Sequence, residues 1–258
     1  MKRAIDVAPF GELADPRVLA SLAVAAEDNG WDGFFVWDHM AYRDVRAVAD
    51  PWISLAAVAS ATSSVRIGPM VTPLSRRRVH KVARETATLD LLSNGRLTLG
   101  VGLGASSHGE LEPFGEVTDP RERARLLDKG LDDLARYWGG DFEPIPVQRP
   151  RIPVWVAGVW PNLRPVRRAA RWDGLFAIGM NSPDGLAEMA AQARVVREVD
   201  TPFDVITEIP PDDDPRYNKP YEYPKNPDSL NPSLKGSGGQ GVQPVRGPRM
   251  PGMGPGGF

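Results

Sequence analysis

The chain has 258 residues, a formal net charge of −2 and 41% hydrophobic residues, an ordinary composition for a globular protein. It lacks the ~18 uninterrupted apolar residues of a membrane helix, and its near-neutral charge gives no electrostatic attraction to nucleic acid or an anionic membrane. It has no cysteine, and its three histidines lack metal-site spacing, so we expect no disulfide and no metal. No apolar signal segment is visible at the start, and the expected location is cytoplasmic.

Glycine and proline are unevenly distributed along the chain. There are 26 of each, about a fifth of all residues, and 20 of them fall within residues 209–258. That segment has too few apolar residues to bury the surface that would offset the entropy of ordering it. The distribution predicts a folded domain over residues 1–208 and a disordered tail over residues 209–258.

Residues 1–208 alternate short apolar runs with helical segments. Four helices are predicted to open where a capping side chain precedes proline, at Asp15, Asp50, Asp119 and Ser182. The runs are apolar throughout, which is typical of parallel strands covered on both faces. The first four start 31 residues apart, about the length of one strand–helix unit. The predicted strands are residues 3–9, 34–37, 65–71, 96–102, 153–157, 174–178 and 203–207.

Such regular repetition fits either an open doubly wound sheet or a barrel. An open dinucleotide-binding sheet places GxGxxG after its first strand, whereas residues 8–11 here are Ala-Pro-Phe-Gly. A later triplet, Gly100, Gly102 and Gly104, has the wrong spacing for that motif. The pattern therefore favours an α/β TIM-type barrel, incomplete at about seven βα units because no eighth strand and helix follow residue 208.

A family resemblance rests on the order and spacing of several segments. They are residues 30–39 (GWDGFFVWDH), 65–73 (VRIGPMVTP), 83–104 (beginning ARETATLDLLSNGR), 152–158 (IPVWVAG) and 169–174 (AARWDG). Together they make residues 1–208 resemble the luciferase-like monooxygenase superfamily, whose members are flavin- or F420-dependent TIM barrels. The family closes its barrel with an eighth unit, where this sequence has its Pro/Gly-rich segment.

The resemblance implies an oxidoreductase. The expected enzyme is a monooxygenase that uses reduced FMN and O2 on a small organic substrate, with a separate flavin reductase as its partner. Two alternatives stay open: an F420-dependent dehydrogenase or reductase on the same barrel, and a shortened barrel that binds flavin without catalysis. The resemblance also implies a homodimer formed through helices on the barrel exterior.

The predicted catalytic residues are Asp38 and His39, because the active site of a TIM barrel lies where the strands end. By the resemblance, His39 is the active-site histidine, which hydrogen-bonds flavin or substrate or moves a proton, as imidazole does near neutral pH. A polar residue that only caps the end of a strand would give the same pattern.

The first group of predicted cofactor-binding residues ends the third and fourth strands. The resemblance implies a bulge with a non-prolyl cis bond, Met70–Val71, continued by Thr72 and supporting one face of the flavin ring; an ordinary strand end is the alternative. Gly102 and Gly104 lack Cβ atoms and would let a flat ring approach the backbone, although a tight turn would also use them.

The second group follows the fifth and sixth strands. Gly158 and the loop with Trp160 lead into a helix, whose free N–H groups suit the flavin phosphate, and Gly179 is a further candidate. Trp160 would also line an apolar pocket.

Two features of the neighbouring loops bear on the choice of reaction. Some F420-dependent dehydrogenases of the superfamily place a glutamate directly after the glycine pair, where this chain has Ala105, and Glu110 does not match that position. The run Arg76 to Arg78 is interpreted as a solvated charge run rather than an anion site. His108, in the loop after the fourth strand, is a further candidate for the pocket.

Overall fold

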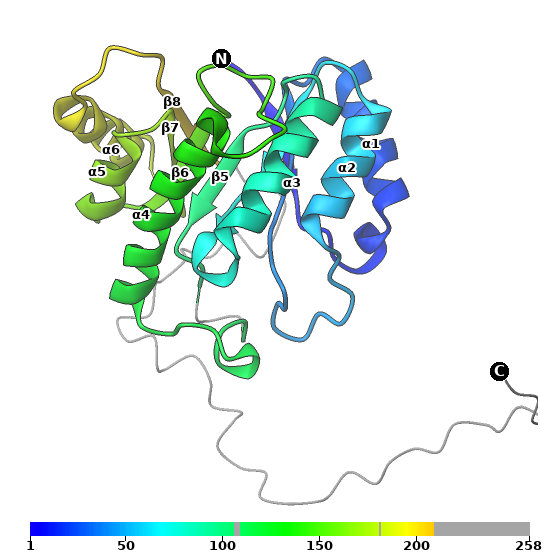
Figure 1. Ribbon diagram of the computed structural model, residues 1–258, viewed down its shortest axis with the longest axis horizontal. Coiled ribbons are helices and arrows are strands. Elements are labelled where there is room, and N and C mark those ends of the chain that lie inside the picture. The colour runs from blue at the N-terminus through cyan, green and yellow to red at the C-terminus, as the bar shows by residue number, and fades with distance from the viewer. Residues whose placement is uncertain (106–108, 181, 209–258) are drawn as a thin grey trace, which may run out of the picture. The chain divides into compact units, whose positions relative to one another are not determined.

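The computed structural model describes residues 1–105, 109–180 and 182–208 (Figure 1). The predicted disordered tail, residues 209–258, and His108 lie outside the described residues. In the described part, parallel strands alternate with helices along the chain, as the sequence predicts. None of the described helices is long and apolar enough to cross a membrane.

The described strands form two parallel sheets that continue one another. One sheet has the order β1-β2-β3 and the other the order β4-β5-β6-β7-β8. A parallel bridge between Ile67 and Leu97 connects β3 to the residues that lead into β5. The strands are β1 (Ala4–Val7), β2 (Gly33–Val36), β3 (Arg66–Pro69), β4 (Thr72–Pro73), β5 (Leu99–Gly102), β6 (Val154–Val159), β7 (Gly174–Ile178) and β8 (Asp204–Thr207).

The third predicted strand is divided in two. Its halves, β3 and β4, are separated by Met70 and Val71, which are joined by a cis peptide bond. The strands β1 to β8 therefore correspond in order to the seven predicted runs. The predicted α/β class with parallel strands is confirmed, and among the described residues no ladder joins β8 to β1.

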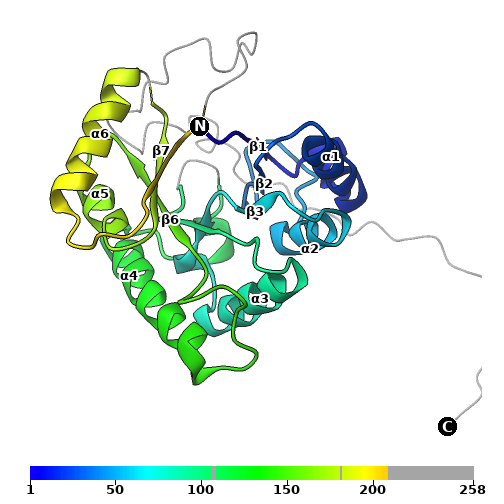
Figure 2. The ribbon, with the colours of Figure 1, turned by 90° about the horizontal axis from the view of Figure 1, so that it is seen from above.

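The helices lie on the outer side of the strands (Figure 2). Each of the four predicted N-caps accepts a backbone N–H of its first turn: Asp15, Asp50, Asp119 and Ser182. A fifth cap, Asn162, opens α5. The helices are α1 (Pro16–Asp28), α2 (Pro51–Ala61), α3 (Val79–Leu92), α4 (Pro120–Arg136), α5 (Leu163–Ala169) and α6 (Pro183–Val196), with short turns η1 (Gly11–Ala14), η2 (Leu74–Arg76), η3 (Glu112–Phe114) and η4 (Tyr137–Asp141).

Two apolar cores lie on opposite sides of the strands. Side chains alternate along a strand, so Phe34 and Val36 of β2 contact the core beneath the helices, while Phe35 belongs to the core inside the barrel. The inner core is completed by Met70, Trp155 and Phe176. A filled interior of this kind is what a TIM-type barrel requires, and it leaves the site at the ends of the strands.

Close approach of the strands requires glycine at two inward positions. A Cβ on Gly68 of β3 would lie 1.9 Å from the carbonyl oxygen of Thr98. A Cβ on Gly100 of β5 would lie 2.3 Å from the carbonyl oxygen of Pro69. These glycines set the separation between β3 and β5, and they therefore fix the place of the bulge between β3 and β4.

Replacing Gly68 by alanine is expected to lower the free energy of unfolding by at least about 3 kcal/mol, because the new methyl group meets backbone that cannot move aside. Gly139→Ala is the matched control, since a Cβ there has nothing within 4 Å, and its effect should stay within about 0.5 kcal/mol. Urea unfolding followed by circular dichroism measures both. Equal stability of the two variants would contradict this description of the interior.

Candidate active site

The predicted site residues gather at one end of the barrel, where the parallel strands have their carboxyl ends. Asp38 and His39 follow β2, and the bulge lies between β3 and β4. The remaining residues stand at or just after the ends of the next three strands: Gly102 and Gly104 for β5, Gly158 and Trp160 for β6, and Gly179 for β7. The structure thus brings the predicted residues to the carboxyl-terminal edge of the strands. Their individual contacts are described in turn below.

Asp38 is a buried anchor for the loop after β4. Its side chain has no exposed surface. Its carboxylate accepts hydrogen bonds from the Thr72 hydroxyl at 2.8 Å and from Arg77 Nη2 at 2.6 Å, while Arg76 Nη2 donates to its backbone oxygen at 2.7 Å. The predicted cofactor residue Thr72 therefore directs its hydroxyl to Asp38, and any contact of Thr72 with a ligand would involve its backbone.

Glu110 is the carboxylate that holds His39, a role that was not predicted from the sequence. Its Oε1 lies 2.9 Å from His39 Nδ1 and 3.0 Å from Arg76 Nη1, and it accepts the backbone N–H of Met40 at 2.8 Å. Burial raises the pKa of Glu110, but the hydrogen bond from His39 and the positive charges of His39 and Arg76 outweigh it, so the pKa is lowered. Glu110 is thus an ionised acceptor that orients the imidazole.

The interpretation of residues 76–78 as a solvated charge run is wrong for Arg76. Only 2% of its side chain is exposed, and it bridges Asp38 and Glu110. Arg77 is mostly buried against Asp38, whereas Arg78 is exposed. The reason is that the loops after β2 and β5 each carry a buried carboxylate to this point, which draws the guanidinium groups inward.

The predicted cis bond between Met70 and Val71 is confirmed. Glycines on β5 make room for the side chain of Val71: a Cβ on Gly102 would lie 2.8 Å from Val71 Cγ2, and one on Gly100 would lie 3.2 Å from Val71 Cγ1. Gly102 therefore serves the packing of the bulge. Met70 is buried in the inner core, and Val71 packs against that core while staying partly exposed.

The turn after β5 is held from outside the barrel by Arg123 of α4. Gly104 has a φ of +76°, a conformation that favours glycine. Arg123 Nη1 donates to the carbonyl oxygens of Leu103 at 3.2 Å and Gly104 at 2.6 Å. Arg123 is a buried residue that the sequence did not single out, and the turn with Gly104 depends on it.

The remaining predicted cofactor residues have different surroundings. A Cβ on Gly158 would lie 3.0 Å from both Met189 Cε and Pro165 Cβ, so Gly158 allows β6 to pack closely against the outer helices. Trp160 packs against the outer core. Gly179 has a φ of +64° and nothing within 4 Å of its Cβ position, so its backbone is open to a ligand.

Four aromatic rings cluster beside this network: Phe10, Trp37, His39 and Tyr42. The ring centroids of every pair lie between 5.0 Å (His39–Tyr42) and 6.2 Å (Phe10–Trp37) apart. We call these four side chains the aromatic cluster. All four are half-buried.

Asp6 and Glu208 bring two carboxyl groups together between β1 and β8. The indole N–H of Trp37 donates to Asp6 Oδ2 at 2.9 Å. Burial, followed by the charge and the hydrogen bond of Glu208, raises the pKa of Asp6 to about 8 although the Trp37 hydrogen bond lowers it. Burial also raises the pKa of Glu208. Asp6 is therefore protonated at neutral pH and hydrogen-bonds Glu208 across the gap between the two strands.

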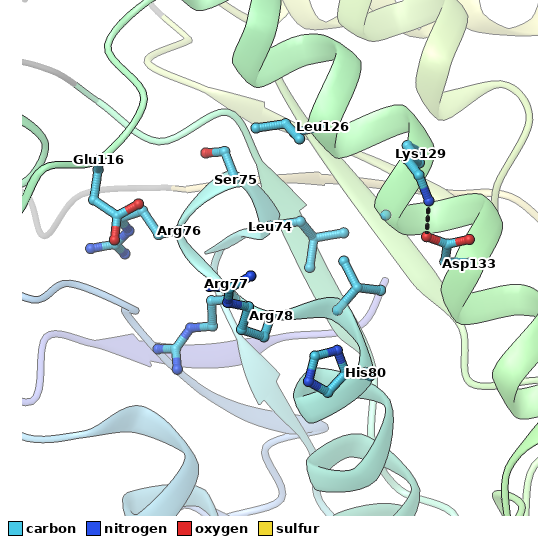
Figure 3. A pocket seen from close by; sticks show the side chains of 12 residues that line it. Leu74, Ser75, Arg76, Arg77, Arg78, His80, Glu116, Leu126, Lys129 and Asp133 are labelled. Carbon is cyan, nitrogen blue, oxygen red and sulfur yellow. Dashed lines mark hydrogen bonds and ion pairs between the residues drawn. The ribbon is translucent and has the colours of Figure 1, made fainter.

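A cavity of about 450 Å³ lies behind the network, between η2, the start of α3 and α4 (Figure 3). Leu74 and Leu126 supply apolar lining, and Lys129 forms an ion pair with Asp133 at its side. Arg76 is part of its wall, but none of the predicted cofactor residues lines it. We therefore treat this cavity as separate from the candidate active site.

The sequence was also compared with protein families and with curated proteins. The sequence profile of the luciferase-like monooxygenase family matches residues 5–211. The oxygenase component of the flavin-dependent trigonelline monooxygenase of Acinetobacter baylyi is 28% identical over 176 residues, 63% of this chain and 48% of that protein. An F420-dependent glucose-6-phosphate dehydrogenase of Amycolatopsis mediterranei is 35% identical over 129 residues, 49% of this chain and 39% of that protein.

A solved structure extends the likeness to the fold. It is the oxygenating constituent of the 3,6-diketocamphane monooxygenase of Pseudomonas putida in complex with FMN, with a TM-score of 0.66 and 18% identity over 80% of this chain and 66% of that one. The chain therefore belongs to the luciferase-like monooxygenase family. It spans less than half the length of the two curated relatives described above.

Replacing Arg76 by methionine is expected to lower the free energy of unfolding by about 3–5 kcal/mol, because it leaves two buried carboxylates short of a partner. Arg78→Met removes a neighbouring but exposed arginine and should cost no more than about 0.5 kcal/mol. Urea unfolding at pH 7 compares them, and equal losses would show that Arg76 is not the residue that neutralises the network.

Asp6→Asn is expected to stabilise the protein more as the pH rises. The pKa of Asp6 is about 8 in the folded chain and about 3.9 when unfolded, so wild-type stability falls as pH rises through this window. Asparagine carries no such proton, and its gain in melting temperature over the wild type should grow from pH 5 to pH 9. Glu208→Gln should change in the same direction. A difference independent of pH would contradict the assigned pKa.

Proposed function

We propose that the protein is a flavin-dependent oxidoreductase that uses reduced FMN and O2 to oxygenate a small organic substrate. The observation that carries the proposal is the position of His39, which stands at the mouth of the barrel and is oriented by the buried, ionised Glu110. Family membership and the similarity to a flavin-dependent monooxygenase support it.

The residues at the mouth suit a flat, phosphate-bearing cofactor. Met70 and Val71 interrupt the strand between β3 and β4, and their backbone would support one face of the ring. Gly179 leaves open space beside its backbone, as an approaching ligand requires. The loop after β6, including Trp160, leads into the capped N-terminus of α5, which suits a phosphate better than a ring.

Reduced FMN bound there would supply the electrons for reaction with O2 and the substrate. His39 would give or take the accompanying proton, and Glu110 would keep its imidazole in one orientation. Asp38 is proposed as a positioning residue, because its carboxylate is buried and joined to Thr72 and Arg77. The inner core beneath the site, with Phe35 and Trp155, excludes water from one side.

The ionised state of Glu110 favours oxygenation over a hydride transfer assisted by a proton-donating acid. Its pKa is lowered, so it is a poor proton donor, and Ala105 occupies the position where some F420-dependent members carry an acid. Hydride transfer with F420 remains the second candidate function, supported by the 35% identity to an F420-dependent dehydrogenase over about half of the chain. In either case we propose a homodimer in the cytoplasm, with a separate flavin reductase for the FMN enzyme.

Titration of the full chain with FMN and with F420, followed by visible absorbance, tests the proposal. FMN is expected to bind, and its reduced complex should be reoxidised only when O2 is admitted. His39→Ala should slow this reoxidation by a factor of about 100 or more through loss of proton transfer, with FMN affinity unchanged. His80→Ala, an exposed histidine at the start of α3, is the matched control.

Each other outcome contradicts a stated part of the proposal. Binding of F420 without FMN would replace it by the hydride-transfer function. Binding of FMN without any reaction of the reduced form with O2 would indicate a flavin carrier. A His39→Ala variant that reoxidises at the wild-type rate would remove His39 from the chemistry.

A further inference from the structure

We propose that the aromatic cluster is the substrate-recognition surface and that it selects molecules with a planar aromatic ring. This inference rests on the proposed function, because it assigns the substrate class of the same site. It depends on where the rings of Phe10, Trp37 and Tyr42 lie and on what holds them around His39.

The rings belong to the mouth of the barrel and not to its packing. Among the described residues, Phe10, Trp37 and Tyr42 are members of neither the outer nor the inner apolar core. They are half-buried, so each keeps some ring surface accessible. Large aromatic side chains that contribute to no core and gather beside a proton-transferring histidine are well placed to contact a ligand.

Backbone contacts hold the cluster in place. Phe10 and Val48 form an antiparallel bridge, and Tyr42 forms a second one with Val45. The backbone N–H of Ala49 donates to Pro9 at 3.0 Å, and that of Gly11 donates to Ala47, also at 3.0 Å. The loop after β2 is thereby fastened to the residues after β1, and the rings are pre-organised before any ligand arrives. Pre-organisation reduces the ordering cost of binding.

Two ring nitrogens of the cluster are directed to carboxyl groups of the protein. The indole N–H of Trp37 donates to Asp6, and Nδ1 of His39 lies 2.9 Å from Glu110. These contacts fix the orientation of the Trp37 and His39 rings. Arg43 lies over the Tyr42 ring, 5.3 Å from its centroid, and the part of the cluster that stays exposed is the surface offered to a ligand. Such surfaces prefer another aromatic ring, in an edge-to-face or offset arrangement, over a saturated group of the same size.

A matched pair of alcohols tests the proposal. Calorimetry with the full chain, with and without FMN, measures the affinities of 2-naphthylmethanol and its decahydro analogue, which differ in aromaticity while sharing the same carbon skeleton. The aromatic alcohol is expected to bind about tenfold more tightly. Phe10→Leu and Tyr42→Leu should each reduce this preference below about threefold while FMN affinity and melting temperature stay close to the wild type.

A control variant and two further outcomes complete the test. Phe142→Leu removes a ring that stacks on Tyr137 beyond the end of α4, and it should keep the full preference. Equal affinity of the wild type for the two alcohols, with FMN binding normally, would overturn this inference and leave the proposed function standing. A preserved preference in a chain that fails to bind FMN would support the ring surface and contradict the proposed function.

Discussion

The mouth of the barrel depends on the pairing of buried charges. Asp38 and Glu110 come from the loops after β2 and β5, and Arg76 and Arg77 from the residues after β4. Removing a partner from a buried ion pair costs several kcal/mol, because the remaining charge has lost its hydration. The loops are therefore held to one another, and His39, next to Asp38 in the chain and in contact with Glu110, takes its position from this arrangement.

Local features of the fold were predictable because their causes are local. A capping side chain followed by proline sets the start of a helix within three residues, and the four predicted caps are found at Asp15, Asp50, Asp119 and Ser182. Continuous apolar runs likewise located the parallel strands. The division of the third strand at Met70–Val71 came from family resemblance, since no property of these two side chains indicates it.

The parts of the site that escaped prediction join residues distant in the sequence. Glu110 accepts a hydrogen bond from Met40, 70 positions away, and Arg123 supports a carbonyl group 19 positions before it. In the sequence, a glutamate or arginine that will be buried and paired looks the same as one that stays in solvent, which is the usual place for both residue types. The same limit explains Arg76 and Arg77: three consecutive arginines suggest a hydrated surface, and only the fold turns two of them inward.

The gap between β1 and β8 leaves two strand edges unpaired among the described residues, which bears on association between molecules. In a closed barrel every strand is paired on both sides, but among the described residues β1 pairs only with β2 and β8 only with β7. Unpaired strand edges are templates for the addition of a strand from another molecule. Here each edge strand has four residues, and carboxyl groups stand at or beside it in Asp6 and Glu208. Very short edge strands oppose such addition, whereas Asp6, protonated at neutral pH, brings a charge to its edge only as the pH rises past about 8.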